Sequence, residues 1–158
     1  MSKPTTVTTD RPYPARIGQL PRQLEAVTPE FLTSLLGHRY QGIEVQSFNV
    51  IELKNSHTTK LRIELNLNEG EASQGLPRNV CLKSNWSEGF ESGDICELEA
   101  RFYHLMRNEV SAPLPQVYFA DWDGDGGGRG IVVMEDLGLA AGSFGNSQDH
   151  IGVDGVAA

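Results

Sequence analysis

Five short segments of the chain have hydrophobic patterns that predict β-strands: most show some alternation of hydrophobic and polar residues, and residues 131–134 form a nearly continuous apolar run, as expected of a strand buried on both sides. The alternation is clearest in residues 60–67, where every second residue is leucine or isoleucine. In residues 43–53 it slips near Ser47, which indicates a bulge or a strong local twist. The five predicted strands are residues 43–53, 60–67, 78–84, 117–122 and 131–137.

A helical period predicts two helices between these strands. The longer helix covers residues 94–108, with Asp94 as N-cap and Glu97 placed to complete a capping box. The shorter helix begins after Thr28, a good N-cap, and ends at Gly37. Five apolar residues share one arc of the longer helix and are expected to pack on the sheet: Ile95, Leu98, Phe102, Leu105 and Met106.

This order of elements predicts an α+β fold, in which a twisted antiparallel sheet of about five strands carries one long helix and a short N-terminal helix. Residues 1–26 are rich in Thr, Pro and Arg without periodicity, so we expect an extended or disordered arm there. Residues 27–138 contain every predicted strand and helix. Residues 139–158 are Gly-rich and loop-like.

Two charged residues are predicted to face the same interior. Side chains alternate along a strand, so Cys81 and Lys83 point to one side while Val80 and Leu82 point to the other. Glu99 projects within the apolar arc of the longer helix. A carboxylate aimed into a core is costly unless a cation meets it. We therefore predict a Lys83–Glu99 ion pair, the alternative being a surface lysine and an ordinary helix glutamate.

A strand lysine held by a helix glutamate resembles the small lobe of protein kinases. Three segments make the resemblance specific to one family of kinases: EARFY at 99–103, APLPQVY at 112–118 and VVMEDL at 132–137. Together they closely resemble the aminoglycoside phosphotransferase and choline kinase-like family, nearest to its ecdysteroid-kinase-like branch. The resemblance covers roughly residues 27 to 145.

The resemblance implies that residues 27–138 form a kinase-like N-terminal lobe that binds ATP with Mg²⁺. Lys83 would contact the phosphates, Glu99 would orient Lys83, and Cys81 would lie against the adenine. Met134 would lie behind the base, and backbone groups of a hinge at residues 135–137 would pair with it. The residues expected to bind nucleotide are Lys83, Glu99, Cys81, Ser56, Met134, Glu135, Asp136 and Leu137.

Ser56 belongs to a connection, residues 54–59, that lies over the phosphates in the resembled family. The connection contains no glycine, although its backbone donors and hydroxyl groups suit a phosphate. A plain polar hairpin turn is an equally good interpretation of the segment.

The full enzyme of this family transfers the γ-phosphoryl group of ATP to a hydroxyl group of a small molecule. Its catalytic Asp and its metal ligands lie downstream of the hinge, in and after a His-x-Asp-x-x-x-x-Asn motif. Residues 139–158 contain no such motif. We therefore expect an N-terminal lobe that ends at the start of the large lobe, with no catalytic residue or metal ligand of its own and no activity alone.

Composition and charge exclude some partners. A net charge of −8 argues against nucleic acid, which needs a basic face. No apolar run approaches the ~18 residues of a membrane span, so we expect no membrane association. Two cysteines, one in a strand and one in a helix, make no disulfide framework, and a cytoplasmic setting follows.

Two other functions fit the same residues. In the first, the chain is a catalytically dead lobe that binds nucleotide or a partner protein. In the second, it is an unrelated α+β binding domain. In the last case Lys83 and Glu99 form only a structural ion pair.

Overall fold

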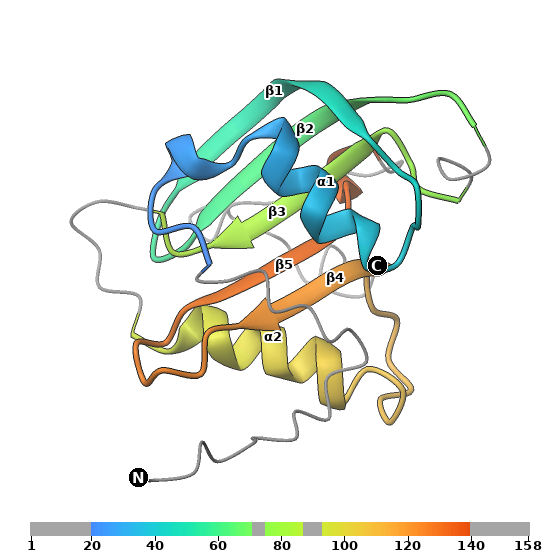
Figure 1. Ribbon diagram of the computed structural model, residues 1–158. Coiled ribbons are helices and arrows are strands. Elements are labelled where there is room, and N and C mark those ends of the chain that lie inside the picture. The colour runs from blue at the N-terminus through green and yellow to red at the C-terminus, as the bar shows by residue number, and fades with distance from the viewer. Residues whose placement is uncertain (1–19, 71–74, 87–92, 140–158) are drawn as a thin grey trace, which may run out of the picture.

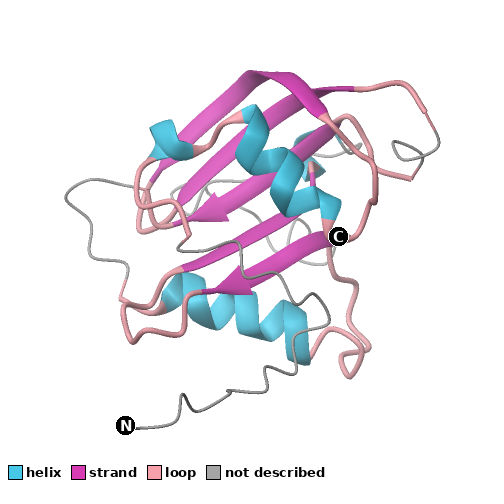
Figure 2. Cartoon of the chain, viewed as in Figure 1, coloured by secondary structure: helices cyan, strands magenta, loops and turns pink. Residues whose placement is uncertain are grey.

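The computed structural model describes residues 20–70, 75–86 and 93–139 and has an α+β fold (Figure 1). Within these residues one antiparallel sheet of five strands carries two α-helices, as predicted (Figure 2). The strands are β1 (Val45–Asn55), β2 (Thr59–Leu67), β3 (Asn79–Ser84), β4 (Val117–Trp122) and β5 (Gly130–Glu135). The helices are α1 (Pro29–Gly37) and α2 (Ile95–Leu105), with single 3₁₀ turns η1 (Leu24–Ala26) and η3 (Leu137–Leu139).

The strands lie in the order β1-β2-β3-β5-β4, and every neighbouring pair is antiparallel. This order places β3 at the centre of the sheet. The β1–β2 register shifts at Gln46 and again at Ile51, so the irregularity predicted near Ser47 is present one residue away.

One face of the sheet carries the larger core. Alternate residues of β2 and β3 point into it and pack under α1, which crosses this face in Figure 1. Thr28 caps α1 as predicted, because its Oγ1 accepts a hydrogen bond of 3.2 Å from the Phe31 backbone N–H. The fully buried leucines of α1 and of these strands are Leu32, Leu35, Leu36, Leu61, Leu65 and Leu82.

The packed region reaches further toward the N-terminus than residue 27. Leu20 is buried in the larger core, and its backbone N–H donates to Asp123 Oδ1 at 2.9 Å. Trp86 Nε1 donates to the Pro21 carbonyl oxygen at 2.9 Å. Residues 20–26 therefore contact the domain, while the rest of the expected arm, residues 1–19, lies outside the described part of the chain. The same holds for residues 140–158 of the expected final segment.

The predicted packing face of α2 is wrong. The five residues of the predicted arc are all exposed, from 37% for Phe102 to 56% for Leu98. The helix instead contacts β4 and β5 through Cys96 and Ala100, which are 2% and 0% exposed. Glu99 and Tyr103 lie half-buried beside this small-residue face.

Glycines explain why a face of small residues is used. A Cβ atom built at Gly130 would overlap the Cys96 carbonyl oxygen, and one at Gly128 would overlap the backbone of Gly93 and Asp94. The first turn of α2 therefore lies directly on the backbone that connects β4 and β5. Leucine or phenylalanine side chains would hold the helix too far away for this contact.

The same contact removes the predicted capping box. Asp94 is the N-cap of α2, but its side chain makes no capping hydrogen bond. The Glu97 backbone N–H donates to the Gly128 carbonyl at 3.2 Å, and the Glu97 carboxylate accepts from Arg101 Nε at 2.9 Å. Because the Gly128 carbonyl satisfies a first-turn donor, Glu97 is left to pair one turn further along the helix.

Neither helix in the described ranges combines the length and the apolar character that crossing a bilayer requires.

Candidate functional site

The second face of the sheet is divided into a covered half and an open half. Helix α2 covers β4 and β5, where a smaller apolar cluster includes Val132 and Met134. Polar side chains occupy the remaining half, on β1, β2 and β3, and we call this half the polar face. Register places on it the paired rows Lys54–Lys60–Lys83, Glu52–Arg62–Cys81 and Asn49–Glu64–Asn79.

The predicted Lys83–Glu99 ion pair is present at the border of these two halves. Lys83 Nζ donates to Glu99 Oε1, and the two side chains are 19% and 21% exposed. Alternation along β3 directs Lys83 to the polar face, and α2 presents Glu99 beside its buried residues. Burial, and after it the charge of Glu99, raises the pKa of the nearby Tyr103 hydroxyl. The pair is therefore partly buried and still reachable from solvent.

A second ion pair crosses the polar face. Arg62 Nε on β2 donates to Asp136 Oδ1, just beyond β5, at 2.7 Å, and Arg62 also reaches Glu52 at 3.0 Å. Hydrogen bonds to Asp136 and then to Glu52 raise the pKa of the Arg62 guanidinium. Because β3 lies between β2 and β5, and Cys81 is the β3 partner of Arg62, this pair passes over Cys81.

Sequence analysis missed Arg62. Its position on the polar face follows from the alternation within residues 60–67, but its partner lies 74 residues away along the chain. Gly138 completes the arrangement, because its backbone N–H donates to Asp136 Oδ1 at 3.0 Å and a Cβ atom there would overlap the Arg62 guanidinium. The Asp136 side chain is consequently only 2% exposed.

The four site residues predicted at the end of β5 and just beyond it, residues 134–137, do not share one position. Met134 is buried and pairs with Cys81 on the neighbouring strand. The Glu135 backbone N–H donates to the Gln116 carbonyl at 2.8 Å, and its carboxylate accepts from the Gln116 N–H at 2.8 Å. Leu137 begins η3 and is exposed. The Glu135 N–H, expected to be part of a base-binding hinge, is thus already occupied.

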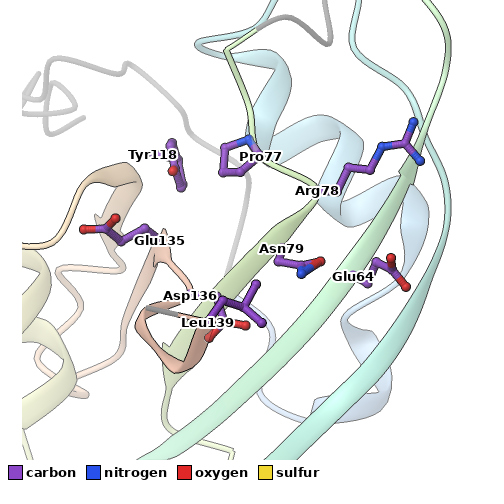
Figure 3. A pocket seen from close by; sticks show the side chains of 8 residues that line it. All are labelled: Glu64, Pro77, Arg78, Asn79, Tyr118, Glu135, Asp136 and Leu139. Atoms are coloured by element: carbon purple, nitrogen blue, oxygen red, sulfur yellow. The ribbon is translucent and has the colours of Figure 1, made fainter. Parts of the chain in front are cut away.

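A pocket of about 450 Å³ opens where β3 begins and β5 ends (Figure 3). Two hydrogen-bond acceptors among its lining residues, Asn79 Oδ1 and Asp136 Oδ2, are buried without a partner. Buried acceptors without partners are rare in folded proteins and point to a donor that is supplied from outside. The residues that line the pocket are Glu64, Pro77, Arg78, Asn79, Tyr118, Glu135, Asp136 and Leu139.

Ser56 lies at the opposite end of the polar face, in the turn between β1 and β2. This turn follows the register pair Asn55–Thr59 and is therefore close to the end of β3 that carries Lys83. The Ser56 backbone N–H and hydroxyl both donate to the Thr58 carbonyl oxygen, at 3.0 Å and 3.3 Å. Both Ser56 donors are therefore used within the turn.

The structure thus brings most predicted site residues to one face. Lys83, Glu99 and Cys81 are neighbours, Met134 lies beside Cys81 on β5, and Asp136 reaches over Cys81 through Arg62. Glu135 pairs with Val80 and therefore points to the other face of the sheet, and Leu137 lies beyond the end of β5. Within residues 20–70, 75–86 and 93–139, no three His, Cys, Asp or Glu side chains are grouped in a way that could hold a metal ion.

Comparisons of this chain with protein-family models, with curated proteins and with solved structures found no match.

Proposed function

We propose that this chain forms the nucleotide-binding lobe of a kinase that transfers the γ-phosphoryl group of ATP to a hydroxyl group of a small molecule. The observation that carries the proposal is the Lys83–Glu99 ion pair. It joins the third strand to the helix that follows it in the chain. Protein kinases hold the ATP phosphates with a lysine on the third strand, and a glutamate on the next helix holds that lysine.

The chemistry of the pair suits a phosphate ligand. The lysine ammonium has three N–H donors, of which Glu99 accepts one, so two remain for phosphate oxygens. Charge-assisted hydrogen bonds of this kind are about twice as strong as neutral ones. Each side chain is about one-fifth exposed, so an anion can reach Lys83 without unfolding the site.

The pocket where β3 begins and β5 ends supplies a place for the base. Its two buried acceptors, Asn79 Oδ1 and Asp136 Oδ2, complement an exocyclic amino group, which donates two hydrogen bonds. Leaving buried acceptors unpaired costs about 1–3 kcal/mol each, so a ligand that pairs them gains affinity. Asn79 and Lys83 point to the same face about 13 Å apart along β3, a separation that suits a base at one end and phosphates at the other.

Arg62 lies between these two ends. A nucleotide extended along β3 has to contact its guanidinium or displace it from Asp136, since the Arg62–Asp136 pair crosses the strand at Cys81. A guanidinium stacks well on flat aromatic rings. In this proposal Arg62 therefore contacts the base or ribose, and Cys81 lies beneath it.

The described residues account for the nucleotide contacts of this proposal and not for the rest of the reaction. ATP supplies the phosphoryl group, and Mg²⁺ neutralises the charge of its phosphates when it is bound. Since no metal-binding group of side chains is present in the described part of the chain, we assign no Mg²⁺ ligand there. The proposed phosphate acceptor is a small hydroxyl compound. The cytoplasm, where ATP is present and both free thiols remain reduced, is the proposed compartment.

Calorimetric titration with ATP and Mg²⁺ tests the proposal. We expect weak binding, in the millimolar range, because one lobe contributes only part of the binding free energy. Lys83→Gln and Glu99→Gln should each weaken it about tenfold. Arg22→Gln removes one positive charge at an exposed site before η1 and is the matched control. If the wild-type chain binds no ATP, or Lys83→Gln binds it equally well, the pair has only a structural role.

Inosine triphosphate tests the base pocket separately. It carries a carbonyl oxygen where adenine carries the amino group, so it would place an acceptor against Asn79 and Asp136. We expect weaker binding than ATP by about tenfold. Equal affinities would remove the pocket from the proposal and leave only the phosphate contact.

A further inference from the structure

Three of the four lysines in the chain lie side by side on the polar face. Lys54 on β1 pairs with Lys60 on β2, and Lys60 pairs with Lys83 on β3. Directly paired residues on antiparallel strands point to the same side of the sheet. We call these three residues the lysine row; with strands about 4.8 Å apart it spans about 10 Å.

The lysine row carries more positive charge than its neighbours balance. Glu99 pairs with Lys83 at one end. In the described ranges no salt bridge joins Lys54 or Lys60 to an acid, and the nearby carboxylates of Glu52 and Asp136 bind Arg62. Like charges directly opposite each other on neighbouring strands are destabilising. An anion bound across the row would remove this repulsion.

The surroundings of Cys81 agree with this arrangement. Burial and the charge of Asp136 raise the pKa of the Cys81 thiol, whereas the charges of Lys83, Lys60 and Arg62 oppose that shift. Register and strand alternation place these three cations on the same side of the sheet as the thiol. A local group of cations is unusual in a chain with a net charge of −8, and it concentrates anions at this face.

The turn between β1 and β2, next to the lysine row, favours phosphate binding by side chains over phosphate binding by backbone N–H groups. Both donors of Ser56 are directed at the Thr58 carbonyl, and the turn contains no glycine that would let the backbone approach a phosphate closely. Lys54 and Lys60 lie on the strands immediately before and after this turn. Their flexible ammonium groups bind phosphate as point charges.

We propose that the lysine row binds a chain of phosphate groups, with Lys83 at one end and Lys54 at the other. Lys54 and Lys60 then supply the contacts that a glycine-rich loop supplies elsewhere. The identification of this ligand as the triphosphate of ATP rests on the proposed function. The row itself requires only a polyphosphate.

Titration with inorganic tripolyphosphate tests the row without a base. We expect the wild-type chain to bind tripolyphosphate more tightly than orthophosphate, because only the longer anion reaches all three lysines. Lys60→Gln and Lys54→Gln should each weaken tripolyphosphate binding about tenfold, as expected for one charge-assisted hydrogen bond. Arg22→Gln, which removes an equal charge outside the polar face, should leave it unchanged.

Thermal melting of the ligand-free protein gives a second measurement. Lys60 and Lys54 are exposed, so their replacement leaves the core intact. Lys60→Gln removes a charge that has a lysine on each side and should raise the melting temperature by a few degrees. Tripolyphosphate should then stabilise the wild-type chain more than it stabilises Lys60→Gln.

The results separate the two proposals. If ATP binds through Lys83 while Lys54→Gln and Lys60→Gln behave like Arg22→Gln, the lysine row is refuted and the proposed function stands. If tripolyphosphate binding depends on all three lysines but ATP binds no better than tripolyphosphate, the row stands and nucleotide recognition is refuted. If neither anion binds the wild-type chain, both proposals are wrong.

Discussion

Replacing Arg62 with methionine tests whether its pair with Asp136 is a buried charge pair. The Asp136 side chain is 2% exposed and that of Arg62 is 21% exposed, and the Nε–Oδ1 distance is 2.7 Å. The second partner, Glu52, is half exposed. Methionine retains an apolar stem of similar length and removes only the cation. The Asp136 carboxylate is then left in the interior without its counter-ion.

The expected loss of stability follows from these exposures. Removing one member of a buried ion pair costs about 3–5 kcal/mol, whereas an exposed contact such as that with Glu52 adds at most about 1 kcal/mol. The Gly138 N–H still donates to Asp136 at 3.0 Å, and Arg62 is not fully enclosed. We therefore expect Arg62→Met to lower the free energy of unfolding by about 3 kcal/mol.

The reverse substitution should cost less. In Asp136→Leu the Arg62 guanidinium keeps Glu52 and its contact with solvent, so we expect a loss of about 1.5 kcal/mol. The double variant Arg62→Met, Asp136→Leu replaces the pair with apolar groups. Such replacements of buried pairs are often neutral, so its stability should return to within about 1 kcal/mol of the wild type.

Urea unfolding followed by tryptophan fluorescence measures all four proteins. Trp86 lies in the larger core and Trp122 in the cluster under α2, so the two indole rings report on opposite faces of the sheet. A single transition by fluorescence and circular dichroism supports a two-state analysis. If Arg62→Met costs less than about 1 kcal/mol, or no more than Asp136→Leu, the pair is solvated and the reasoning from burial is wrong.

Three further predictions concern α2 and its contacts. Ala100→Leu overpacks the contact with β4 and β5 and should lower the free energy of unfolding by about 1–3 kcal/mol. Leu98→Gln, at an exposed position, should change it by less than about 0.5 kcal/mol. The opposite ranking in urea unfolding would support the helix face predicted from sequence. Burial raises the pKa of Cys96 from 9.0 to about 11, so between these pH values the unfolded chain loses a proton that the folded chain retains. Stability should therefore fall by about 2–3 kcal/mol as pH rises through this window, and unfolding curves of Cys96→Ala should lack that part of the loss. Gly130→Ala should lower the melting temperature because the added Cβ would overlap the backbone of α2. Gly37→Ala is the control, since nothing lies within 4 Å of the Cβ it adds. Equal melting temperatures of the two variants would show that α2 is less tightly packed than the structure indicates.

The Lys83–Glu99 pair was predictable because two local patterns are enough to define it. Strand alternation directs Lys83 away from the side of Val80 and Leu82, and this holds in the structure. The helical wheel placed Glu99 toward the interior, which is also correct, although the apolar arc around it is exposed. At ~100° per residue the packed face lies roughly 140° around the helix from the predicted arc, but Glu99 is at the edge of that arc nearest to Cys96 and Ala100 and therefore still reaches Lys83.

The sequence by itself determined the strands, the cap of α1 and the direction of each strand side chain. These features depend on the backbone geometry of neighbouring residues, which the alternation of residues such as Leu61 and Ile63 reports directly. Only the tertiary structure decided which face of α2 packs, since that depends on whether the backbone at Gly128 and Gly130 lets the helix approach closely.

Tertiary structure also decided which charges meet. The lysine row exists because the registers of two strand pairs align three strands at the same level. The Arg62–Asp136 pair exists because β3 alone separates β2 from β5. Strand order and register are set by the sum of many weak contacts over the whole sheet, so no local pattern around Lys54, Lys60 or Arg62 contains them.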